Sequence, residues 1–236
     1  MDEPFQLFGP AHLLIICLTF LLPALLVAAT RLLCSNFFIN MVLFTLASVL
    51  VANRIWAVSI AWDAGVRRWA DFLPLHLCDV ATFMVVIACF TRHAGLIRIT
   101  YFFALAGTLQ AILTPDIRVN FPEPRFISFF VSHCGIVISA LYLTFGLKIY
   151  PRWQNIIHAF LWLQIYALTA FATNFLFGTN FGYLARKPAN PSMLDFFGPW
   201  PWYILVLEVL AIVKFTLLFA PFYFLKLLHR TKQQKA

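Results

Sequence analysis

With 236 residues, of which 62% are hydrophobic and only 11% charged, the chain is too apolar for an ordinary soluble domain, in which about a quarter of the residues are charged. Its net charge of +8 does not indicate a nucleic-acid-binding protein, because the basic residues are spread over short loops and a tail rather than gathered on one basic surface. Four of the five cysteines lie in or beside apolar segments, which excludes a disulfide framework.

Seven apolar runs follow one another along the chain, each close to the roughly 20 residues that cross a bilayer. The runs are continuous rather than alternating, which predicts membrane-spanning helices and not strands. We therefore expect an all-α polytopic membrane protein, a bundle of seven transmembrane helices that forms a single integral membrane domain over residues 1–236. The predicted spans are residues 11–30, 37–62, 74–91, 97–114, 125–148, 154–176 and 200–227.

The two ends of the predicted bundle differ in charge. One end carries nine basic residues and no acidic residue, and the other carries six basic residues against seven acidic ones. Because basic loops remain in the cytoplasm, we expect the N-terminus outside and the C-terminus in the cytoplasm. The nine residues of the predicted cytoplasmic end are Arg31, Arg92, Arg98, Lys148, Arg152, Lys226, Arg230, Lys232 and Lys235.

Most polar side chains of the predicted spans fall in the outer half of the membrane. Counting inward at about 1.5 Å per residue places Cys78 roughly 6 Å deep and His133 roughly 12 Å deep, whereas Lys214 lies deeper, at about 20 Å. Ionisable residues inside a membrane usually mark a functional site or a paired structural cluster. We therefore expect a cavity that opens toward the outer face, beneath the three longer loops. The polar layer consists of Arg54, Cys78, Asp79, Gln110, His133, Asn174 and Glu208.

The stretch PLHLCDV suggests a reactive cysteine. Pro74 is expected to begin the third span, which places Cys78 one turn into a helix, where the helix end favours a thiolate. His133 at similar depth would then act as the base of a Cys–His pair for acyl transfer, whereas His76 points to another side of the helix. The alternative is that Cys78 is a small buried hydrophobic residue and that His133 hydrogen-bonds a neighbouring helix. Cys134 is a rival nucleophile, but it points about 100° away from His133.

The charged residues of the layer have two interpretations. Arg54, Asp79 and Glu208 neutralise one another, or Arg54 holds a lipid phosphate or a carboxylate. No paired-histidine or HExxH motif supports a metal site, although the ligand types are present in His76, Asp79, His133 and Glu208. We expect neither a metal nor another cofactor.

The long loop before the last span, NFGYLARKPANPSMLDFFGPWPWY, is rich in proline and tryptophan. One interpretation is an anchor whose indole rings lie at the membrane surface. The other, compatible with the first, is a lid in which Arg186 and Lys187 attract an anionic lipid head group.

Several blocks together resemble a known family. They are LPLHLCD, LAGTLQAILTPD, FPEPRFISFFVSHCG, NFLFGTNFGYLARKP and LDFFGPWPWYILVLE. In their order they are similar to the signature blocks of the YwaF-type bacterial integral membrane proteins, whose animal relative is transmembrane protein 164. The resemblance runs from the second to the seventh span. It implies an acyltransferase that acts on phospholipids, with Cys78 and His133 at the positions of the active-site cysteine and histidine.

From the residues and the resemblance together we expect a multi-pass protein of a cell membrane, which is the bacterial inner membrane or a plasma membrane. We expect it to move acyl chains between lipids through a thioester on Cys78. Whether water or a second lipid resolves the thioester is open. The expected partners are membrane lipids, not nucleic acid. The alternative is a transporter or lipid-binding membrane protein without catalysis. Supporting roles are expected for His76, Asp79, Arg54, Glu208, Asn174 and Gln110.

Overall fold

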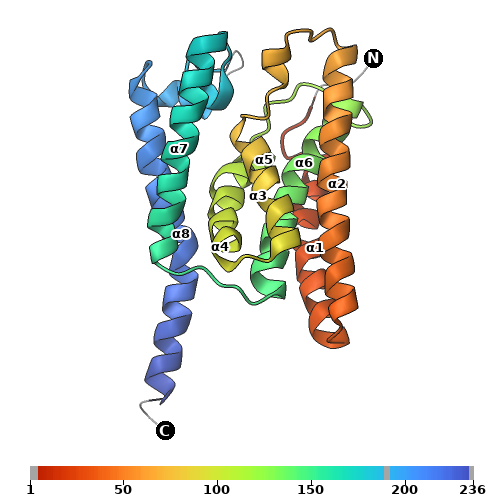
Figure 1. Ribbon diagram of the computed structural model, residues 1–236, viewed down its shortest axis with the longest axis vertical. Helices are drawn as coiled ribbons and strands as arrows, with labels where there is room; N and C mark the ends of the chain where they lie inside the picture. Colours follow the sequence, from red (N-terminus) through yellow and green to blue (C-terminus); the bar gives the residue numbers. More distant parts are fainter. Residues whose placement is uncertain (1–4, 189–191, 234–236) are drawn as a thin grey trace.

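The computed structural model describes residues 5–188 and 192–233, and every regular element in this part of the chain is helical (Figure 1). The α-helices are α1 (Pro10–Leu33), α2 (Asn36–Asp63), α3 (Leu77–Thr91), α4 (Ala94–Phe103), α5 (Leu109–Leu113), α6 (Pro124–Leu141), α7 (Gln154–Phe177) and α8 (Trp202–Gln233). Two π-helical segments, η2 (Ala104–Thr108) and η3 (Tyr142–Gly146), continue α4 and α6. Short 3₁₀ turns lie in the loops at η1 (Trp69–Phe72), η4 (Phe181–Tyr183) and η5 (Met193–Phe197).

Within the described residues, six helical segments are long and apolar enough to cross a membrane, which confirms the multi-pass helical class. They are α1, α2, the continuous α4–η2–α5 segment, the continuous α6–η3 segment, α7 and most of α8. The predicted third span corresponds to α3, which has only 15 residues. At 1.5 Å per residue such a helix covers about 22 Å, less than the roughly 30 Å of a hydrocarbon core. The structure therefore supports six full spans and one shorter apolar helix.

The start of α3 differs from the prediction. Pro74 does not begin the helix, because it lies in a bend before His76, which has extended backbone angles and caps the helix at Leu77. The His76 N–H donates to Asp79 Oδ2 at 3.2 Å, and this bond satisfies an N–H at the helix start that lacks a partner within the helix. Elsewhere the local signals do agree with the boundaries. Pro124 is the first residue of α6, and the carboxylate of Glu123 accepts from the Arg125 N–H at 2.9 Å.

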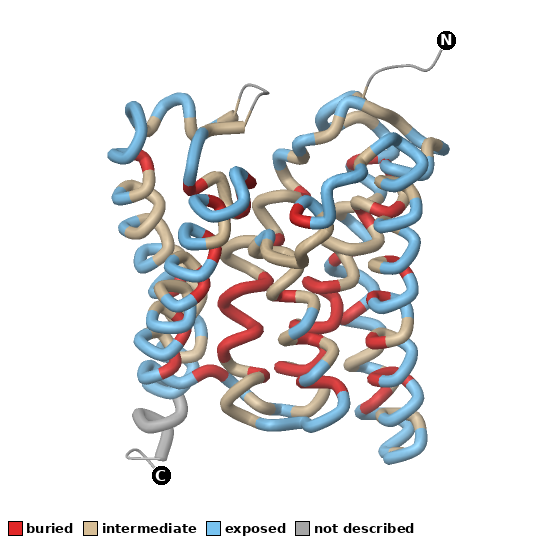
Figure 2. The backbone as a smooth tube through the Cα atoms, turned by 45° about the horizontal axis from the view of Figure 1, so that its top comes forward, coloured by how far each residue is buried: buried red, intermediate tan, exposed pale blue. Residues whose placement is uncertain are grey.

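The core lies around α4 and α6. Half of the residues in the most apolar stretches of the α4–η2–α5 and α6–η3 spans are buried, against 11% for α8. Figure 2 shows the buried residues gathered in the centre of the bundle, with the outer helices largely exposed. α6 packs against α1, α2 and α3, whereas α7 and α8 pack together at one edge of the molecule (Figure 1).

Large apolar side chains cover the outer helices instead of being buried. On α8, Leu205 is 58% exposed, Val209 61% and Leu217 65%. In water such a continuous apolar surface would aggregate, whereas in a bilayer the lipid chains cover it. The exposed apolar surface and the long apolar helices together make this a membrane protein.

The longer connections gather at one end of the bundle (Figure 1). They are residues 64–76, 114–123 and the described parts of the loop before α8, residues 178–188 and 192–201, whereas the connections at the other end are residues 34–35, 92–93 and 147–153. The predicted direction, with the N-terminus outside and the C-terminus in the cytoplasm, stays a prediction. Of the charged residues used for it, Asp2, Glu3 and Lys235 lie outside the described residues, as do the side chains of Arg230 and Lys232.

Candidate functional site

The first turn of α3 holds the residues of the PLHLCDV stretch. With His76 as the cap, Cys78 is the second residue of the helix and Asp79 the third. The Asp79 N–H donates to the carbonyl of the capping residue His76 at 2.9 Å, and the N–H groups at this end of the helix carry the positive end of the helix dipole. Cys78 is half-buried, so its thiol is sheltered from solvent at the N-terminal end of the helix.

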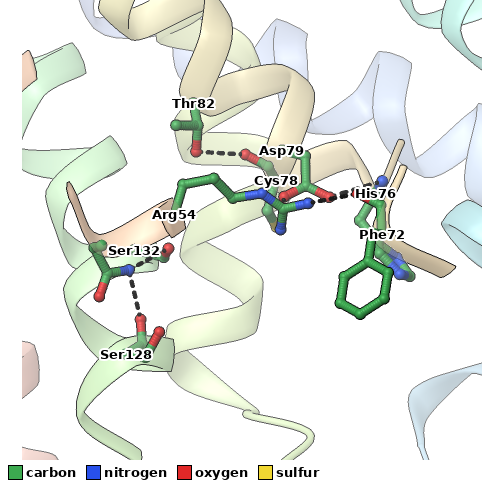
Figure 3. Close-up of polar contacts among 9 residues, drawn as sticks. Arg54, Phe72, His76, Cys78, Asp79, Thr82, Ser128 and Ser132 are labelled. Atoms are coloured by element: carbon green, nitrogen blue, oxygen red, sulfur yellow. Dashed lines mark hydrogen bonds and ion pairs between the residues drawn. The ribbon is translucent and has the colours of Figure 1, made fainter. Parts of the chain in front are cut away.

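An ion pair joins this turn to α2. Arg54 Nη1 lies 2.9 Å from Asp79 Oδ1, and Arg54 Nη2 also donates to the Phe72 carbonyl at 3.3 Å. Figure 3 shows the Arg54 side chain reaching from α2 to the first turn of α3. The side chains are 33% and 14% exposed, so each charge depends on the other for compensation. Arg54 is thus held by the protein, which favours the structural interpretation over a phosphate-binding one.

One threonine and two tyrosine side chains lie near the Cys78 thiol. The Thr108 side chain, from the π-helical segment η2, is within hydrogen-bonding reach of the sulfur. Thr108 Oγ1 is buried and makes no hydrogen bond of standard geometry to nitrogen or oxygen among the described residues. The Tyr166 and Tyr183 side chains, from α7 and η4, lie close enough to Cys78 to interact with a charge on it. The Tyr183 hydroxyl donates to Asp116 Oδ2 at 3.2 Å, so Thr108 is the hydroxyl group within hydrogen-bonding reach of the thiol.

Sequence analysis missed Thr108, Tyr183 and Tyr166, of which Tyr166 is the most deeply placed tyrosine of the site. Its side chain is only 9% exposed, and its hydroxyl has no hydrogen-bond partner of standard geometry in the part of the chain that is described. The hydroxyl lies near the Leu77 backbone, Cys78 and Asp79. Gly182 approaches it so closely that a Cβ added there would lie 2.6 Å from the hydroxyl oxygen. A hydropathy pattern treats tyrosine as apolar, and only a hydroxyl within an otherwise apolar span could have pointed to it.

His133 lies on α6, which packs against α3. Its Nδ1 is 2.7 Å from the Phe129 carbonyl, and its ring stacks on the Phe129 ring at a centroid distance of 4.1 Å. Because a carbonyl only accepts hydrogen bonds, Nδ1 carries the proton of the neutral ring, and Nε2 is the basic nitrogen. The His133 ring also lies within electrostatic range of His76. This tautomer leaves the lone pair of Nε2 available to accept a proton.

Cys134 faces a different part of the bundle. Its thiol lies against the Thr19 hydroxyl of α1, and it packs, as Ile15 and Ile16 of α1 do, against a separate apolar cluster of α6 and α5 residues. The rival nucleophile thus lies on the α1 side of α6, whereas α3 carries Cys78.

Two other members of the predicted layer have local partners. Glu208 on α8 accepts from Gln164 Nε2 on α7 at 2.5 Å, so it does not join the ion pair of Arg54. Asn174 accepts from the Phe181 N–H at 2.7 Å and donates to the Phe181 carbonyl at 2.9 Å. Asn174 thereby fixes the loop that carries η4, and it acts on the site through the position of that loop.

The remaining candidates lie in two places. Gln110 accepts from Lys214 Nζ at 3.2 Å and donates to Thr114 Oγ1 at 2.9 Å. In the long loop, Lys187 Nζ is 3.9 Å from the Asp195 carboxylate, and the backbone of Arg186 is held by Asn180. Lys187 is therefore already neutralised in part within the loop.

A groove of about 500 Å³ lies between the end of α2 and the start of α6, at the end of the bundle with the longer loops. Phe129 is one of its walls and also stacks on His133, so the groove ends one aromatic ring away from the imidazole. Cys78 is not among its lining residues. The groove is lined by Ala57, Ile60, Ala61, Ala64, Val66, Arg125, Ser128 and Phe129.

The site does not have the composition of a metal centre. Within residues 5–188 and 192–233, no three histidine, cysteine or acidic side chains gather as ligands. The carboxylates of Asp79 and Glu208, which were considered as metal ligands, contact Arg54 and Gln164 respectively.

Comparison with known proteins identifies the family. The model of the TMEM164 family matches residues 7–219, which is most of the chain and includes every residue of the polar layer. Comparison with curated proteins and with solved structures gave no match. The match, together with six apolar helices of spanning length, shows that the chain belongs to the TMEM164 family of multi-pass membrane proteins.

Proposed function

We propose that the protein is a lipid acyltransferase in which Cys78 is the nucleophile and His133 the general base. The observation that carries the proposal is the hydrogen bond from His133 Nδ1 to the Phe129 carbonyl. This bond leaves Nε2 as a proton acceptor on the helix that packs against α3, which carries Cys78. The resemblance to an acyltransferase family implies the same two residues.

The chemistry follows from the roles of these groups. Cys78 Sγ attacks the ester carbonyl of a lipid while its proton passes to His133 Nε2. The C–O bond of the ester breaks, the departing lipid oxygen takes the proton from His133, and the acyl chain remains on Cys78 as a thioester. A hydroxyl of the acceptor lipid then attacks the thioester as His133 takes its proton, and the C–S bond breaks to restore the thiol.

Tyr166 is the group that we assign to the oxyanion. Each attack places negative charge on the carbonyl oxygen, and a preorganised donor in a dry site stabilises it strongly. The buried Tyr166 hydroxyl lacks a standard hydrogen-bond partner in the described chain and lies beside the first turn of α3. The N–H groups at the start of α3 would supply further donors.

The groove between α2 and α6 is our candidate for the lipid entrance. Its walls are apolar apart from Ser128 and Arg125, and the Arg125–Glu123 contact is loose at 3.9 Å. A guanidinium there suits a lipid phosphate, whereas Arg54 is held by Asp79 at 2.9 Å. A lipid bound in this way would place its ester near Phe129 and His133. Arg186, in the long loop, is a second candidate for the head group.

The alternative function is a transporter or lipid-binding membrane protein without catalysis. The Arg54–Asp79 ion pair favours it, because a paired charge inside a membrane also occurs in transport sites. Against it, Glu208 bonds Gln164 and does not extend the pair into a continuous polar path.

An acyl-transfer assay separates the two functions. The protein in nanodiscs receives a phospholipid with a deuterated acyl chain and an unlabelled lysophospholipid, and mass spectrometry measures the deuterated product. We expect transfer by the wild type, none by Cys78→Ala, and a loss of about 10²–10⁴-fold in His133→Ala. Full transfer by Cys78→Ala would refute the proposal. Transport lost in Arg54→Gln but retained in Cys78→Ala would establish the alternative.

A further inference from the structure

Lys214 is an intramembrane cation that the acyl chemistry does not use. It is half-buried near the middle of the apolar span Trp202–Leu228. None of the ion pairs between described residues includes it. The acidic residue of the same helix, Glu208, bonds Gln164 on α7 instead. A lone ammonium group at this depth is costly and usually marks a functional site.

The protein positions this ammonium group with neutral acceptors. Lys214 Nζ donates to the Ala106 carbonyl and to Gln110 Oε1, both at 3.2 Å. Ala106 belongs to the π-helical segment η2, and π-helical turns recur at functional sites. An ammonium group has three donors, so two bonds hold its position and the third donor and the full charge remain for a ligand.

An apolar slot of about 260 Å³ opens beside Lys214, between the α4–η2–α5 span and α8. Lys214 and Gln110 are its polar lining residues, and the others are all leucines. A single ammonium group at the edge of an apolar slot is complementary to a molecule with one anionic end and an alkyl chain. The leucines are Leu105, Leu109, Leu113, Leu217 and Leu218.

We propose that this slot binds a free long-chain fatty acid, with its carboxylate on Lys214 and Gln110 and its chain along the leucines. A lysine acts as a point charge that suits one carboxylate, whereas a phosphodiester is better held by the planar fork of arginine. The slot contains no arginine, serine or threonine for the further phosphate oxygens. The fatty-acid slot does not include Cys78, so this proposal can be tested independently of the acyltransferase proposal.

Photolabelling tests the site in the intact protein. The protein in phosphatidylcholine nanodiscs is labelled with palmitic acid that carries a diazirine and an alkyne, and unlabelled palmitate or methyl palmitate competes. We expect palmitate to compete at least tenfold better than its uncharged ester, because a hydrogen bond to a charged group is lost with the ester. Labelled peptides should come from α5 and α8.

Three variants give the comparison. Lys214→Met should weaken palmitate binding tenfold or more, and the matched control Lys226→Met, at an exposed position of the same helix, should not. Leu217→Trp keeps the charge and fills the slot, so it should also weaken binding if Lys214→Met fails to fold. Cys78→Ala should bind as the wild type does. Wild-type affinity in Lys214→Met or in Leu217→Trp, or equal competition by methyl palmitate, would overturn the proposal.

Discussion

Replacing Gly182 by alanine tests the close approach of the η4 loop to Tyr166. The added Cβ would lie 2.6 Å from the Tyr166 hydroxyl oxygen, where ordinary contacts begin near 3.4 Å, so the hydroxyl would have to move by roughly 0.8 Å. Gly182 also has a φ of +63°, and a non-glycine residue in this region costs about 1–3 kcal/mol. Crowding of a packed site adds about 1–3 kcal/mol.

Gly178 provides the matched control. Its φ is +65°, and a Cβ there would meet no atom within 4 Å. Gly178→Ala therefore carries the backbone strain alone, whereas Gly182→Ala carries the strain and the clash. A difference of about 1–3 kcal/mol lowers the melting temperature of a chain of this length by a further 2–12 °C or so.

Thermal unfolding in detergent, followed by intrinsic fluorescence, measures the difference. Tyr166→Phe removes the clashing oxygen, and the next atom of the ring lies 3.4 Å from the added Cβ. The double variant Gly182→Ala/Tyr166→Phe should therefore unfold at a higher temperature than the value expected from adding the two single effects. Equal melting temperatures for Gly178→Ala and Gly182→Ala would refute the predicted contact, as would strict additivity in the double variant.

Three further substitutions test other contacts. Arg54→Met leaves the Asp79 carboxylate unpaired and should lower the free energy of unfolding by about 1–3 kcal/mol, less than for a fully buried pair because Arg54 is 33% exposed. Adding Asp79→Asn to this variant should restore part of the lost stability. If denaturant unfolding shows no recovery in the double variant, the pairing is contradicted. Burial and the neighbouring Asp116 carboxylate raise the pKa of Tyr183 to about 12, so its contribution to stability is present below pH 10 and is lost between about pH 10 and 12. Tyr183→Phe should reduce the fall in melting temperature over that window, and an unchanged profile would refute the assignment. Cys134→Ala should retain full acyl-transfer activity, since this thiol faces Thr19; loss of activity without loss of folding would make Cys134 the nucleophile.

The membrane class and the limits of most helices were predictable because long apolar runs determine where a chain can cross a bilayer. The start of α3 was not, since proline can begin a helix but does not have to. Here the reciprocal contact of His76 with Asp79 sets the start at Leu77. The hydropathy of residues 74–76 carries no signal for that cap.

The candidate site was predicted in part, for a related reason. Span order and depth grouped the polar residues by level, but they do not define which side of a helix faces which neighbour. Depth counting placed Glu208 with Arg54, whereas Glu208 bonds Gln164 of the adjacent α7. Depth counting also missed Tyr166, because the contact of Tyr166 with Gly182 depends on how the loop after α7 folds back.

Trapping the acyl-enzyme tests the central claim most directly. The protein in nanodiscs is incubated with a phospholipid that carries an alkyne-tagged acyl chain, quenched in acid and examined for a label that hydroxylamine removes. We predict a hydroxylamine-sensitive label on the Cys78 peptide of the wild type, none in Cys78→Ala, a reduced label in His133→Ala and an unchanged label in Cys134→Ala. An equally strong label in Cys78→Ala, or no label in the wild type with any glycerophospholipid class, would contradict a thioester at Cys78.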